Sequence, residues 1–145
     1  MKRIWTSVLV CVAPACGGLL DEGIYDVSIS AEADQCGLSD GTTGEEEWIV
    51  SDKGDGKWSI TFDDGGEADG KETGGGDAIV FHEEGYDANG PGGCWIDHSV
   101  GMTLDPDGDS FAGSLVARMA ASSCDDPADD GSTCKSTFDV SGDKQ

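Results

Sequence analysis

The sequence predicts an all-β protein: a small antiparallel meander of about seven strands, barrel-like or a sandwich, held together by disulfide bonds. Three observations lead to this prediction. Several segments alternate between apolar and polar residues, the pattern of a strand with one buried face. Glycine is abundant, with 23 residues in a chain of 145, and together with aspartate it fills the stretches between those segments, where both favour turns. Apart from the N-terminal apolar run, no segment sustains the helical period of 3.6 residues.

The alternating segments, taken in order, give the individual strands. The clearest is 57–63, in which Trp58, Ile60 and Phe62 share one face and polar residues occupy the other. The remaining strands are expected at 23–31, 48–50, 78–82, 94–104, 111–121 and 134–140. Most connections are short enough for neighbouring strands to pair, which favours a barrel-like meander over a sandwich. A lipocalin-like barrel fits this strand count, although no motif identifies that family.

Three connections have distinctive compositions. Residues 53–56, Lys-Gly-Asp-Gly, predict a hairpin turn. Residues 64–77 are rich in glycine and acidic residues and lack large apolar side chains, so we expect a mobile loop there. Residues 125–131 predict an acidic turn between two cysteines.

The N-terminus has the layout of a secretory signal. A basic start, Met1-Lys2-Arg3, precedes the apolar run 4–12 and the small-residue site Ala13-Pro14-Ala15. The run is too short to span a membrane, which takes about 20 apolar residues. We expect residues 1–15 to be removed, which leaves 6 basic against 30 acidic residues and a formal charge of −24.

The sequence Ala-Pro-Ala-Cys at 13–16 resembles the cleavage site of bacterial lipoprotein signal peptides. The resemblance implies cleavage before Cys16, a diacylglycerol thioether on its sulfur and attachment to a membrane. Ala13 stands where that family usually has Leu, and an ordinary signal peptidase would also accept the Ala15–Cys16 bond. In that family an Asp after the cysteine retains the protein at the inner membrane. Gly17 therefore implies the outer membrane, on its periplasmic or its exterior side.

The expected organisation is a lipidated tether at 16–21 followed by a single β domain at 22–145. Cysteine parity supports the lipid, because five of the six cysteines remain after cleavage and one thiol would lack a partner in an oxidising compartment. With Cys16 lipidated, the other four form two disulfides. Of the three possible pairings we expect Cys124–Cys134 and Cys36–Cys94.

The charge balance, 30 acidic against 8 basic residues, excludes nucleic acid and anionic membrane surfaces as partners. It attracts cations, and the best cation candidate is the set Asp105, Asp107 and Asp109, which resembles the start of an EF-hand loop. Ser110 and Val116 stand where that loop needs Gly and Glu. We therefore expect a hairpin turn, with weak Ca²⁺ binding as the alternative and no other cofactor.

No combination of residues points to catalysis. The chain has two histidines, His82 and His98; neither follows Ser110 to act as its base, and no four-ligand zinc spacing is present. His98 shares its face with apolar residues, so we expect it to be buried and hydrogen-bonded. Trp95 has the opposite parity and is expected to be exposed, available to stack on a sugar or anchor a partner. Trp95 and His98 are thus the candidate ligand contacts.

These observations favour a non-enzymatic, envelope-anchored lipoprotein that binds a protein, glycan or small-molecule partner. One alternative is a small-ligand carrier whose barrel cavity is lined by residues such as Trp58, Phe81 and Met102. Another is a weakly calcium-binding secreted protein.

Overall fold

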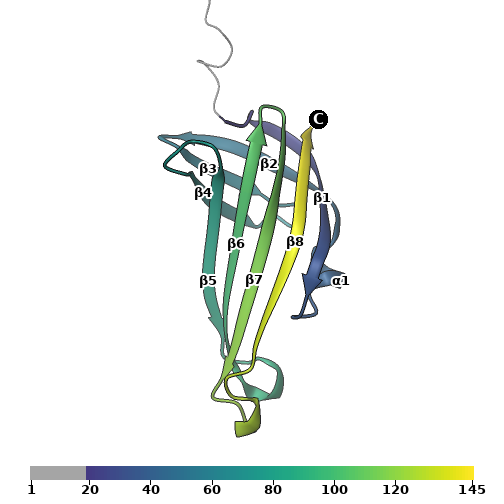
Figure 1. Ribbon diagram of the computed structural model, residues 1–145, viewed down its shortest axis with the longest axis vertical. Coiled ribbons are helices and arrows are strands. Elements are labelled where there is room, and N and C mark those ends of the chain that lie inside the picture. Colours follow the sequence, from purple (N-terminus) through teal and green to yellow (C-terminus); the bar gives the residue numbers. More distant parts are fainter. Residues whose placement is uncertain (1–18) are drawn as a thin grey trace, which may run out of the picture.

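The strands form one closed antiparallel barrel (Figure 1). The apolar residues of each alternating segment face its interior. The computed structural model describes residues 19–145. Eight strands follow one another in chain order, and β8 pairs with β1 to close the barrel. They are β1 (Gly23–Asp34), β2 (Gly44–Gly54), β3 (Lys57–Thr61), β4 (Glu67–Glu72), β5 (Ile79–Asp87), β6 (Trp95–Asp107), β7 (Ser110–Ser122) and β8 (Thr133–Lys144). Short helical turns are α1 (Ser39–Thr42), η2 (Pro91–Gly93) and η3 (Pro127–Asp129). The predicted all-β, barrel-like and disulfide-bonded fold is confirmed.

The eighth strand, β4, lies inside the segment 64–77 for which we expected a mobile loop, and that expectation was wrong. Its only buried position is Gly70, and Ala68 is partly buried, so no large apolar side chain marks it. A Cβ at Gly70 would lie 2.5 Å from a ring carbon of Phe81. The ring of Phe81 therefore fills the space that a larger side chain on β4 would have taken.

Aromatic side chains fill the closed part of the barrel. Tyr25 packs on Phe111, with ring centroids 5.4 Å apart, and Phe111 stacks on Trp48 at 5.9 Å. Trp48 in turn meets Phe62 edge-on at 5.3 Å. Burial raises the pKa of Tyr25 to about 12, with Asp21 and Asp109 adding to the effect. These contacts form a packed core in the closed part of the barrel.

Only part of the barrel is closed, because the strands have unequal lengths. β6 and β7 have 13 residues each, whereas β3 has 5 and β4 has 6. β4 pairs with β5 only from Gly70↔Phe81 to Glu72↔Ile79, and β2 pairs with β1 only as far as Ile29↔Gly44. In Figure 1 strands β5 to β8 accordingly continue far beyond β2, β3 and β4. The inner side of this extension has no sheet opposite it.

The folded domain begins before the predicted boundary at residue 22. Leu20 is buried and bridges to Gly108 in the β6–β7 turn, and the backbone N–H of Asp21 donates to the Gly108 carbonyl at 2.7 Å. Leu19 also packs against the core. The predicted signal peptide and Cys16 lie outside the described residues.

Two disulfides join the four predicted cysteines, but the expected pairing was wrong. The bonds are Cys36–Cys134 and Cys94–Cys124. Strand register explains this result. The β1–β8 pairing reaches Asp34↔Ser136, which brings the residue two beyond Asp34 beside Cys134. The β6–β7 pairing Trp95↔Ser122 likewise brings together the two cysteines just outside it.

Candidate binding face

A partly exposed apolar surface lies on the inner side of the barrel extension. Strand alternation directs its side chains inward, but β2, β3 and β4 do not reach far enough to cover them. We call this surface the open face. Its residues are Ile96, His98 and Val100 on β6 and Met119 and Ala121 on β7.

A hollow of about 630 Å³ lies around His98 and Met119, and two others extend this surface. One, of about 470 Å³, lies at the far end, where Ile96, Met119 and Ala121 meet the loop around Pro91. The other, of about 310 Å³, is a slot in the fork where β4 and β5 diverge. Its lining combines apolar side chains, Phe62, Phe81, Val100, Met102 and Leu115 among them, with acidic residues on β4 and β5. Apolar lining with a few polar groups is typical of binding sites.

His98 points inward, as its parity predicted, but it is partly exposed, and so the expected full burial was wrong. A Cβ at Gly85 would lie 2.7 Å from two ring atoms of His98, so the imidazole lies directly over Gly85 on β5. Among residues 19–145 the ring has no hydrogen-bond partner, contrary to expectation. The imidazole is therefore a polar group available within the open face.

Trp95 is 48% exposed, as its parity predicted. Its ring stacks with that of Tyr86, which is 68% exposed; the centroids are 5.8 Å apart and the planes differ by 9°. This aromatic pair belongs to the outer side of the sheet, whereas His98 belongs to the inner side. The two predicted ligand contacts are therefore not part of one site.

Within the part of the chain that the structure describes, the edge of β5 beside the open face has no strand partner. Ile79, Val80 and Phe81 pair with β4, whereas the following stretch, 82–87, pairs only with β6. On this stretch His82 and Glu84 interact on the outer side, with 3.0 Å between Nε2 and Oε1. His82 and His98 thus face opposite sides of the sheet and do not converge.

The aspartates at 105–109 form the predicted hairpin. β6 and β7 pair as far as Asp107↔Ser110, so Gly108 and Asp109 make a two-residue turn. Gly108 has a φ of 69°, which glycine adopts without steric cost. Within residues 19–145 no three His, Cys, Asp or Glu side chains are grouped so as to hold a metal ion.

The residues suggested for a carrier cavity do not surround one space. Phe81 and Met102 line the slot in the β4–β5 fork, whereas Trp58 lines a separate hollow with lysines of β3 and β4. All three side chains are at least 95% buried in the core. They contribute to packing in the closed half of the barrel.

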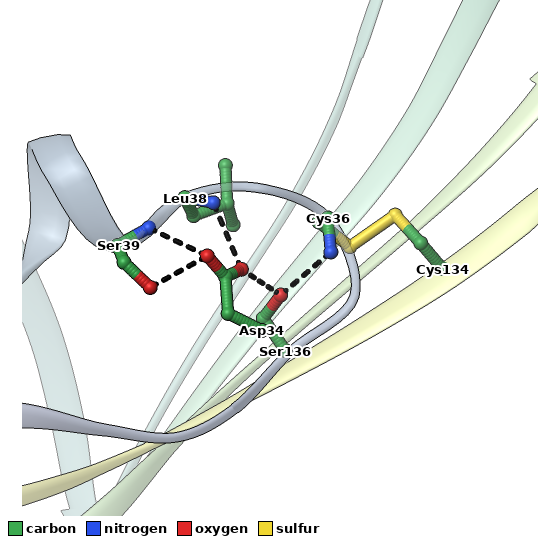
Figure 2. The surroundings of a disulfide bond; sticks show 6 residues. All are labelled: Asp34, Cys36, Leu38, Ser39, Cys134 and Ser136. Atoms are coloured by element: carbon green, nitrogen blue, oxygen red, sulfur yellow. Dashed lines mark hydrogen bonds between the residues drawn. A yellow bond between two sulfur atoms is a disulfide. The ribbon is translucent and has the colours of Figure 1, made fainter.

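A cluster of hydrogen bonds around Asp34 and Ser136, which we call the clasp, joins the end of β1 and the β1–β2 connection to β8 (Figure 2). Ser136 Oγ donates to Asp34 Oδ1 at 2.6 Å and accepts from the Cys36 N–H at 3.0 Å. Asp34 also accepts from the Ser39 N–H and hydroxyl and from the Leu38 N–H. These bonds, with that from Ser136 the largest contributor, hold the pKa of Asp34 well below its usual range.

Sequence reasoning missed this clasp, although two signals were present. Ser136 is the one hydroxyl among the apolar residues on the inner face of 134–140. Asp34 precedes a short turn, where an aspartate often accepts from nearby backbone N–H groups. A polar residue on an apolar face needs a partner, and Asp34 is that partner here.

Comparison of the chain with protein-family models, curated proteins and solved structures gives no match to any of them. Within the described range, 19–145, no helix has the length and apolarity needed to cross a bilayer.

Proposed function

We propose that the protein is an envelope-anchored lipoprotein that acts as a non-enzymatic binding module, with the open face as its binding surface. The observation that carries this proposal is the open face itself. Its side chains have the inward parity of core residues, yet remain partly exposed because the barrel is incomplete above them. Contiguous exposed apolar surface of this kind marks interaction sites more often than ordinary surface does.

The position of Leu20, four residues after Cys16 in the sequence, supports this role. Leu20 is bound to the β6–β7 turn at Gly108, and β6 runs from that turn to the far end of the open face. At about 3.3 Å per residue, this strand spans up to about 40 Å. A lipid on Cys16 would hold the closed end of the barrel toward the membrane and leave the open face directed away from it. The two disulfides suit an oxidising compartment, and Gly17 favours the outer membrane.

The binding surface is tested with N-phenyl-1-naphthylamine, a neutral apolar fluorophore. We expect the wild type to bind it and Met119→Glu to weaken binding severalfold, because a carboxylate in the open face opposes apolar contact. The matched control is Val116→Glu, on the outer side of the same strand. Equal fluorophore binding by the two variants would contradict the assignment of the open face.

The anchor is tested by the intact mass of the mature protein and by palmitate labelling in a bacterial host. We expect a lipid on the wild type and none on Cys16→Ala. A mature wild type without acyl mass would rule out the lipoprotein part of the proposal and leave the binding surface unaffected.

A further inference from the structure

The unpaired edge of β5 is a template for another strand. Among residues 19–145, the stretch 82–87 pairs with β6 on one side only, and its backbone N–H and C=O groups on the other side have no strand partner. β4 diverges from it, since Glu67, Ala68 and Asp69 pair with β3 alone. The 310 Å³ slot occupies this fork. Uncovered edges of this kind accept extended peptides as additional strands.

Charge selects the partner. The free stretch of β5 carries Glu83, Glu84 and Asp87, and Glu67 and Asp69 line the other side of the fork. With Cys16 as the mature start, 30 acidic residues face 6 basic ones, so a second copy of this chain would be repelled at the edge. The same acidic residues attract a segment rich in Lys or Arg. Self-association is thereby disfavoured and a basic partner is selected.

The two sides of the free edge differ in chemistry. On the outer side lie His82, Glu84 and Tyr86, and Tyr86 is stacked on Trp95. Carboxylates and aromatic faces both favour cationic side chains. On the inner side Glu83 and Asp87 lie on either side of Gly85, and the edge borders the apolar part of the slot and the imidazole of His98 over Gly85. Because successive side chains of an added strand point to opposite sides, basic residues would meet the outer side and apolar residues the open face.

We propose that the edge 82–87 binds, by strand addition, an extended segment of another protein in which Lys or Arg alternates with apolar residues. This inference rests on the proposed function and specifies its partner.

The test uses the blocked peptide Lys-Val-Lys-Val-Lys-Val-Lys and the same peptide methylated at every backbone nitrogen. Both carry equal charge and side chains, but the methylated peptide lacks backbone N–H donors on both of its edges. With affinities measured by fluorescence anisotropy at about 0.15 M salt, where long-range attraction is screened, we expect the parent to bind more tightly. The expected difference is tenfold or more, because each backbone hydrogen bond is worth roughly a factor of five.

Two charge-reversal variants locate the site. Glu84→Lys lies on the free edge, and Glu45→Lys makes the same charge change on the outer side of β2, away from it. We expect Glu84→Lys to weaken the parent peptide about threefold to fivefold, from the loss of one cross-strand charge pair and the gain of a repulsion. Glu45→Lys should change affinity less than about twofold, since exposed charges at a distance are screened. Bound parent peptide should also slow hydrogen exchange of the amides at 82–87.

Three results would overturn the inference. Equal affinity for the methylated peptide would exclude strand addition. Equal weakening by Glu84→Lys and Glu45→Lys would mean that general charge attraction, and not a site at the edge, accounts for peptide binding. A dimer whose amides at 82–87 are protected without peptide would make a second copy the occupant. If the fluorophore binds the open face while the peptides fail these tests, the partner assignment alone fails. If neither binds, the proposed binding function fails as well.

Discussion

Replacing Ser136 by alanine tests whether the clasp between β1 and β8 stabilises the barrel. Ser136 is fully buried, and its hydroxyl makes two hydrogen bonds, one to the Asp34 carboxylate and one from the Cys36 N–H. The substitution removes both. A hydrogen bond to a charged group contributes about 1.5–3 kcal/mol and a neutral one about 0.5–1.5 kcal/mol. Taking the two contributions together, we expect the free energy of unfolding to fall by about 2–4 kcal/mol.

The assay is guanidinium unfolding with the disulfides intact, followed by the fluorescence of the buried Trp48 and Trp58. The matched control is Ser141→Ala on the exposed side of the same strand, which should change stability by less than about 0.5 kcal/mol. An NMR titration of Ser136→Ala should show the pKa of Asp34 moving up toward its ordinary value of 3.8. A Ser136→Ala protein as stable as the control, with the Asp34 pKa unchanged, would refute the reasoning.

Three further predictions concern packing, disulfides and pH. Gly70→Ala should destabilise the barrel by about 1–3 kcal/mol, because its Cβ would overpack against Phe81. The double variant Gly70→Ala/Phe81→Leu should recover part of this loss. Gly74→Ala, whose Cβ meets nothing within 4 Å, should have little effect. Non-reduced peptide mapping should link Cys36 to Cys134; it requires cleavage before aspartate, because trypsin leaves Cys124 and Cys134 in one peptide. On the chain-entropy account, removing this bridge should cost about 4–5 kcal/mol against about 3–4 for Cys94–Cys124, whose cysteines are 30 positions apart instead of 98. The unfolding free energy of the wild type relative to Asp34→Asn should fall as pH drops below about 4, because the unfolded state protonates first. The unfolding free energy of the wild type relative to Tyr25→Phe should fall as pH rises from 10.0 toward about 12. In this range the Tyr25 phenol ionises in the unfolded state before it ionises in the folded state.

Parity in the sequence assigned most side chains to the correct side of the sheet. Trp58 and Ile60 are in the core, as are Phe111 and Leu104, and Trp95 is exposed. This works because side chains of a strand alternate whatever its neighbours are. The same rule explains the missed strand. β4 directs Ala68, Gly70 and Glu72 inward, and none of them is a large apolar residue. Its pattern therefore resembles a loop, and only the structure shows that Phe81 of β5 occupies the space over Gly70.

The candidate site could be predicted only in part. Ile96, His98 and Val100 have the same parity as Met102 and Leu104, and nothing local distinguishes the exposed members from the buried ones. The difference arises where β2 stops pairing with β1 and where β4 separates from β5, outside β6 and β7 themselves. The disulfide pairing has the same origin, since Cys134 meets Cys36 through the β1–β8 register and not through spacing in the sequence.

The sequence by itself determined the all-β class, the barrel-like order of neighbouring strands, the acidic surface and the identity of the bonded cysteines. Each of these depends on composition or on a period of two residues, which is local information. The tertiary structure decided which cysteines join, where the barrel stops being closed and which edge stays unpaired. These depend on strand lengths and registers between segments far apart in the chain, and they create the open face and the free edge of β5.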